Sequence, residues 1–248
     1  AGALIVLAAA SGSAAQDYPA RLIRIIVPGT PGGSADILAR MIGAKLTERW
    51  GQPAVIENRS GASQMIGAEA LAKSPPDGHA LMLATISYTT SAATRASLPF
   101  DPLNDVIGVT MVGQGPLLLL VHPSLPARSV RELIALAKAR PGTINYASSG
   151  NGTIVHLVAE VFAARAHIDI VHVPYKAIAA VVTDLVGGHV PTALGSLPAA
   201  WTQVEAGRLR ALAVTTGKRS ELVPKLPTLA EAGLDGIDVS DRKSTRLN

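Results

Sequence analysis

Two turns rich in glycine and serine, each between a predicted strand and a predicted helix, are the segments of this sequence best suited to chemistry. Glycine lets backbone N–H groups approach a ligand closely. The start of a helix favours negative charge, because its first N–H groups are unpaired and its dipole is positive there. Both turns are therefore candidate anion sites. The residues concerned are Gly32, Gly33, Ser34 and Asp36 in the first turn, and Ser148, Gly150, Asn151 and Thr153 in the second.

Hydroxyl groups follow other predicted strands as well. Thr85 and Ser87 stand at the end of a strand at 81–85, Ser196 stands just after a strand at 192–194, and Tyr175 follows a strand at 170–173. In open α/β sheets, ligands bind beyond the carboxyl ends of strands. Any one of these loops, taken alone, is better explained as a helix cap or turn. The two turns, the loop of Thr85 and Ser87 and the loop of Ser196 make four such loops in one chain, and together they favour a binding site.

Signatures of enzymes and metal sites are missing from the sequence. No G-x-G-x-x-G follows the first strand, and neither G-x-x-x-x-G-K-[ST] nor G-x-S-x-G occurs. Cysteine is absent, and acidic residues are sparse and scattered. His167, Asp169 and His172 are the candidate metal ligands. Asp169 and His172 differ by three positions, so on one strand they face opposite sides and cannot easily bind the same ion. We therefore predict no catalytic residue, no metal and no cofactor.

Composition and charge further narrow the functions that this chain could have. The chain has 248 residues and 48% hydrophobic residues, enough for a large core. Aromatic residues make up only 3%, which argues against base or sugar stacking and hence against a nucleic-acid partner. The net charge is +4, of which residues 241–248, with three basic residues and one acidic, supply +2.

The two ends differ from the rest of the chain. Residues 1–15 read as part of a cleavable signal peptide, because a short apolar run is followed by small residues and is too short to span a membrane. Residues 241–248 are polar and patternless and are predicted to be a non-native tail.

Strands and helices alternate along the chain with short loops, which predicts a mainly parallel sheet with helices on both faces. A continuous apolar run at 115–121 predicts a strand buried on both faces. This run and the apolar strand at 209–214 are candidate hinges between two lobes. Strands are predicted at 22–27, 54–57, 81–85, 115–121, 144–147, 170–173, 192–194 and 209–214, and helices at 36–50, 67–73, 130–139, 153–164, 179–186 and 197–206.

Many short motifs, in the same order, resemble one protein family, the periplasmic substrate-binding proteins of tripartite tricarboxylate transporters, also called Bug proteins. The likeness runs from about residue 18 to residue 240. The motifs include Pro31-Gly32-Gly33-Ser34-Ala35-Asp36, Glu57-Asn58-Arg59, Pro76-Asp77-Gly78, Asn145-Tyr146-Ala147-Ser148, Gly150-Asn151-Gly152-Thr153 and His172-Val173-Pro174-Tyr175-Lys176.

The resemblance implies a fold, an activity and partners. The fold is an α/β flytrap of two Rossmann-like lobes with a ligand cleft between them. Lobe 1 would span 16–116, with 219–240 returning to it, and lobe 2 would span 117–218. A monomer in the periplasm would capture a small carboxylate for the membrane permease subunits of the transporter. Gly32, Gly33, Ser34, Asp36, Thr85 and Ser87 would serve lobe 1, and Ser148, Gly150, Asn151, Thr153, Tyr175 and Ser196 would serve lobe 2.

The sequence also departs from the family. Gly29, Thr30, Ala177 and Ala180 replace residues common at the cleft, and Ser63-Gln64-Met65 replaces a stretch that usually contains glycine. The family's chains continue well past residue 240, so the resemblance implies that the C-terminal part of lobe 1 is missing and that an apolar face of lobe 1 is uncovered. Two other functions stay open: an enzyme acting on a carboxylate, and a ligand-sensing lobe for a signalling partner.

Overall fold

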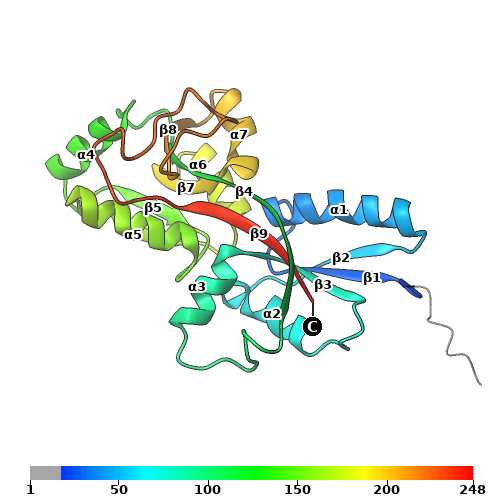
Figure 1. Ribbon diagram of the computed structural model, residues 1–248. Coiled ribbons are helices and arrows are strands. Elements are labelled where there is room, and N and C mark those ends of the chain that lie inside the picture. The colour runs from blue at the N-terminus through cyan, green and yellow to red at the C-terminus, as the bar shows by residue number, and fades with distance from the viewer. Residues whose placement is uncertain (1–17, 248) are drawn as a thin grey trace, which may run out of the picture.

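The computed structural model describes residues 18–247, which form two lobes crossed by two long strands (Figure 1). The predicted signal peptide at 1–15 lies outside the described residues. Within them, no helix has both the length and the apolar character needed to cross a membrane.

The first lobe is built on three parallel strands in the order β2-β1-β3. β1 ends at Val27, and the turn after it contains Gly32, whose φ of +79° suits glycine. The strands are β1 (Ile23–Val27), β2 (Ala54–Asn58) and β3 (Ala80–Thr85), and the helices are α1 (Ser34–Trp50), the 3₁₀ turn η1 (Ala62–Gln64), α2 (Met65–Ala72) and α3 (Ile86–Thr94). The sequence analysis did not predict α3, because Ile86–Thr94 is rich in serine and threonine.

The second lobe repeats this architecture. β5 pairs in parallel with both β6 and β7. The strands are β5 (Asn145–Ser148), β6 (Val171–Pro174), β7 (Thr192–Ser196) and β8 (Arg210–Val214), and the helices are α4 (Val130–Ala139), α5 (Ile154–Ala166), α6 (Ile178–Val186) and α7 (Leu197–Glu205).

Two antiparallel strands, β4 (Ile107–Val121) and β9 (Ser240–Leu247), join the lobes. Figure 1 shows both running from one lobe to the other. β9 lies between β3 and β4, and the end of β4 pairs with β7 and β8. The sheet therefore runs β2-β1-β3-β9-β4-β7-β5-β6, with β8 also on β4.

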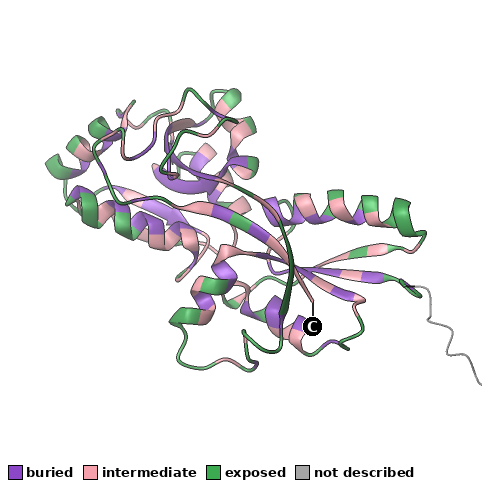
Figure 2. Cartoon of the chain, viewed as in Figure 1, coloured by how far each residue is buried: buried purple, intermediate pink, exposed green. Residues whose placement is uncertain are grey.

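The end of β4 is buried on both faces, as the apolar run at 115–121 predicted. Leu117, Leu119 and Val121 belong to one hydrophobic cluster, and Leu118 and Leu120 belong to another on the opposite face. This separation follows from the two-residue period of a strand. Figure 2 shows buried residues following the strands inside each lobe. The first part of β4 differs, since Ile107, Val109 and Met111 are each more than half exposed.

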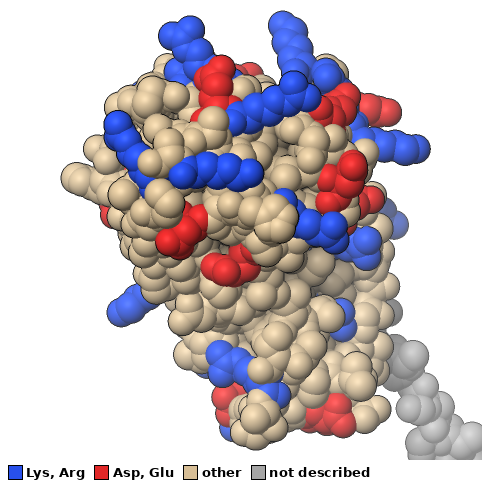
Figure 3. Space-filling view, turned by 90° about the vertical axis from the view of Figure 1, so that its left-hand side faces the viewer, with Lys and Arg blue, Asp and Glu red and all other residues tan. Residues whose placement is uncertain are grey.

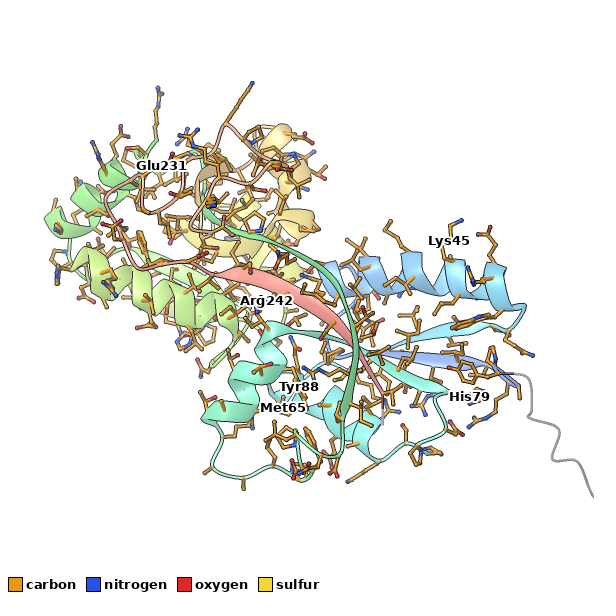
Figure 4. The ribbon with its side chains drawn as sticks, in the orientation of Figure 1. Lys45, Met65, His79, Tyr88, Glu231 and Arg242 are labelled. Atoms are coloured by element: carbon orange, nitrogen blue, oxygen red, sulfur yellow. The ribbon has the colours of Figure 1, made fainter. Side chains whose placement is uncertain are left out.

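Three expectations about the C-terminal region need correction. Residues 219–240 do not pack on the first lobe, because Leu229, Leu234 and Ile237 are buried in a cluster of the second lobe. Glu231, from the same segment, lies over that lobe in Figure 4. β8, one of the two predicted hinges, lies wholly within the second lobe, whereas β4, which contains the other predicted hinge at 115–121, crosses between the lobes together with β9.

Residues 241–248 were expected to be a patternless tail, yet 241–247 belong to β9. Pairing in a sheet uses backbone groups, which a polar segment also has. The two side chains most buried on this strand, Asp241 and Lys243, form an ion pair and neutralise each other.

Candidate ligand-binding site

A cleft of about 500 Å³ lies between the two lobes, within the range of sites for small molecules. Nine of the predicted site residues line it. They are Gly33, Ser34, Asp36, Thr85 and Ser87 from the first lobe, and Gly150, Thr153, Tyr175 and Ser196 from the second. The other three, Gly32, Ser148 and Asn151, stand behind or beside the lining.

Among the described residues, six helices begin at this cleft, five of them after a strand and one, α2, after the η1 turn. For each of the five, the residue that precedes the first turn lines the cleft: Gly33 for α1, Thr85 for α3, Thr153 for α5, Ala177 for α6 and Ser196 for α7. Only α3 is capped by the side chain of that residue, through Thr85 Oγ1 and the N–H of Ser87. By contrast, α4 begins outside the cleft and is capped by Ser129. Four of the five helices that follow a strand thus begin at the cleft without a side-chain cap, and their dipoles favour an anion there.

Ser196 adds a free hydroxyl to this environment. Its side chain lines the cleft, the residue is only 4% exposed, and Oγ has no hydrogen-bond partner among the described residues. A buried hydroxyl without a partner is costly, and a ligand oxygen in the cleft would satisfy it.

Asp36 shapes the site without offering a free group to a ligand. Its carboxylate accepts hydrogen bonds from the backbone N–H of Gly32, the guanidinium of Arg40 and the amide of Asn58, each at 3.0 Å. Burial raises the pKa of Asp36, but these hydrogen bonds outweigh it and hold the pKa below its usual value. Asn58 also donates to the carbonyl of Gly29. Asp36 therefore fixes the turn after β1, and its contact with a ligand stays a prediction.

The phenol of Tyr175 lines the cleft and is also engaged by a partner within the protein. The hydroxyl donates to Asp184 at 2.7 Å, and burial together with this bond raises the pKa of Tyr175. The next residue, Lys176, is exposed and is the one cation among the described residues that line the cleft.

Three hydrogen bonds cross the cleft beside this site. Ser87 Oγ accepts from the N–H of Ile154 at 3.2 Å, Thr90 Oγ1 donates to the carbonyl of Gly152 at 3.2 Å, and Ser63 Oγ donates to the carbonyl of Asn151 at 2.8 Å. Asn151 thus contacts the opposite lobe through its backbone. Because one hydrogen bond contributes only about 1 kcal/mol net, each of these contacts links the two lobes only weakly.

The loop before α2 lines the cleft and was not predicted as part of the site, and the same holds for Asp241 of β9. Ser60 to Gln64 line the cleft, and Ala62, Ser63 and Gln64 have φ values of 46°, 52° and 82°. Consecutive residues other than glycine in this region are strained. Gln64 secures the loop by hydrogen bonds to Thr85 through both ends of its amide. The only sequence signal was that Ser63-Gln64-Met65 replaces the family's usual glycine.

The face shown in Figure 3 carries charged side chains of both signs. Figure 3 shows basic and acidic side chains interspersed over one face, without a large area of a single sign. Among residues 18–247, no group of three or more histidine or acidic side chains is placed to hold a metal ion.

Comparisons with known proteins agree on one family. The tripartite tricarboxylate transporter family receptor matches residues 38–242. Protein BugT of Bordetella pertussis is 41% identical over 221 residues, which cover 88% of this chain and 68% of that protein. The chain spans about two thirds of the length of the curated relatives it matches.

Solved structures agree in fold. The R. palustris protein Rpa4515 with adipate has a TM-score of 0.90 at 39% identity, covering 93% of this chain and 78% of that one. MatC from Rhodopseudomonas palustris with bound malate has a TM-score of 0.86 at 27% identity, covering 93% and 79%.

Proposed function

Because the chain belongs to the tripartite tricarboxylate transporter receptor family, we propose that it captures a small carboxylate in the cleft and delivers it to membrane permease subunits. The observation that carries this proposal is the meeting of four helix starts without side-chain caps around one cleft, with the unpartnered hydroxyl of Ser196 among them. Each is complementary to a carboxylate oxygen.

The ligand class follows from the similar proteins and the lining. Adipate and malate, held by two similar proteins, are both small dicarboxylates. In this chain one carboxylate would receive hydrogen bonds from Ser196 and the helix starts, and the exposed ammonium of Lys176 would favour a second negative group. Closure of the lobes follows if the closed state binds the ligand better than the open one.

The family is one of receptors, and the absence of catalytic activity in this chain is part of the proposal. We further propose a periplasmic monomer exported through a cleavable signal peptide. The enzyme alternative predicts product formation above blank when the protein is incubated with adipate or malate, which our proposal excludes.

Thermal unfolding with and without adipate, malate and other small carboxylates tests the proposal. A ligand at about 100 times its Kd should stabilise the protein by roughly 2.7 kcal/mol, or about 5–10 °C in Tm for a chain of this size. The uncharged diamide of adipate, adipamide, serves as the matched control and should cause no shift. A cooperative transition that no carboxylate shifts would contradict the proposal.

A further inference from the structure

Two histidines lie behind the loop that carries Gly150 and Thr153, on the side away from the cleft. His156 stands on α5 and His172 on β6, and their ring centroids are 4.2 Å apart. Neither ring lines the cleft, and the proposed capture of a carboxylate leaves both without a role.

His156 contacts the loop backbone directly. Its Nδ1 accepts a hydrogen bond from the N–H of Gly152 at 3.3 Å. An imidazole nitrogen accepts only when it carries no proton. Gly152 has a φ of +74° and its carbonyl accepts from Thr90 of the first lobe, so this residue is held through both its N–H and its carbonyl.

His172 contacts the same loop through Ser148. Its Nε2 lies 2.7 Å from Ser148 Oγ, and that oxygen accepts from the N–H of Gly150 at 3.1 Å. Ser148 is fully buried, while Gly150 lines the cleft. Ser148 was expected to contact the ligand. In the structure it lies behind the cleft and connects His172 to Gly150, which lines the cleft.

The surroundings disfavour positive charge on this pair. Tyr146 of β5 stacks on His172 with centroids 4.9 Å apart. Burial and the neighbouring His156 lower the pKa of His172, while Glu160 of α5 opposes them. Glu160 accepts a hydrogen bond from Tyr146 and lies 3.9 Å from His156 Nε2. Tyr146 and Glu160 are thus the titratable groups that face the pair.

We propose that His156 and His172, in their neutral forms, are positioning residues that hold the loop from Ser148 to Thr153 in its ligand-binding geometry. If His156 Nδ1 carried a proton, two N–H donors, one from the ring and one from Gly152, would face each other, and their hydrogen bond would be lost. In doubly protonated His172, Nε2 can only donate to Ser148 Oγ, and the ring places a charge beside His156. Because the pKa of His172 is lowered in the fold, the loop should be ordered at neutral pH and loosen as pH falls below the ordinary histidine pKa of about 6.5.

Nuclear magnetic resonance of the free protein tests this coupling without any ligand. Between about pH 8 and pH 5, the amide resonances of Gly150 and Gly152 should shift together with the ring resonances of the two histidines. His156→Asn keeps an oxygen near the position of Nδ1 but does not titrate, so it should remove the pH dependence of Gly152 while preserving its resonance at high pH. His156→Leu removes the acceptor and should displace that resonance at every pH.

His189→Asn is the matched control, since His189 is an exposed histidine of the same lobe, and it should leave the shifts unchanged. The proposal is overturned if the Gly152 amide does not titrate in the unaltered protein, or if it titrates equally in His156→Asn.

A binding measurement links the loop to function and rests on the proposed capture of a carboxylate. At about pH 8, His156→Leu should weaken adipate binding roughly tenfold, as for the loss of one hydrogen bond, while His156→Asn should bind as the unaltered protein does. Equal Kd values for all three would show that the pair does not position the site. If adipate does not bind the unaltered protein, the choice of ligand is wrong, but the coupling of rings to amides still decides the present proposal.

Discussion

Replacing Ser196 by aspartate is expected to weaken the binding of a small carboxylate by about 100-fold or more. The new carboxylate would occupy the start of α7 and place a negative charge in the lining of the cleft. Two like charges about 4 Å apart at an effective dielectric constant near 20 repel by about 4 kcal/mol, which corresponds to roughly 1,000-fold in Kd. Isothermal titration calorimetry with the carboxylate selected by thermal unfolding measures this loss.

Two controls separate this effect from damage to the fold. Aspartate caps helices as well as serine does, so the variant should still unfold cooperatively. Ser129→Asp makes the same exchange at the start of α4, outside the cleft, and should leave the Kd unchanged. Ser196→Ala removes only the hydroxyl and should cost about three- to tenfold. A Kd for Ser196→Asp within threefold of the unaltered protein would place the ligand away from α7.

The sequence predicted the junctions at the cleft because their physical basis is local. A strand that ends in glycine and serine before a helix can be read from a dozen consecutive residues, as for Gly33, Thr153 and Ser196. Nine of the twelve predicted site residues line the cleft for this reason. The resemblance to a family supplied what local patterns lack, namely that the two lobes face each other.

The roles of individual side chains could not be predicted in the same way. Asp36 and Ser148 have the right chemistry for a ligand, but partners distant in sequence, Asn58 and His172, engage them in the fold. Likewise, the apolar spacing of Leu229 and Leu234 predicts burial but does not specify which lobe covers them. β9 carries no apolar alternation, so hydrophobic pattern alone could not identify it.

Removal of β9 is expected to destabilise the protein strongly, because this strand alone joins β3 to β4 in the described sheet. It pairs with β3 at five residues and with β4 at eight. A chain that ends at Ser240 would leave the facing backbone groups of both strands unpaired. If half of these pairings contribute about 1 kcal/mol each, the loss is of the order of 5 kcal/mol, or about 10–20 °C in Tm. Calorimetric unfolding of the shortened and full chains measures the difference.

A variant that keeps β9 but changes its buried side chains shows whether the stability that this strand contributes comes from backbone pairing or from its polar side chains. Asp241→Val with Lys243→Val removes the buried ion pair but keeps β9, and such replacements are often neutral or stabilising by about 1–4 kcal/mol. The shortened chain should thus be much less stable, and the double variant at least as stable as the full chain. Equal Tm values for the shortened and full chains would instead support the interpretation of 241–248 as a non-native tail, since a strand in the middle of a sheet cannot be removed without cost.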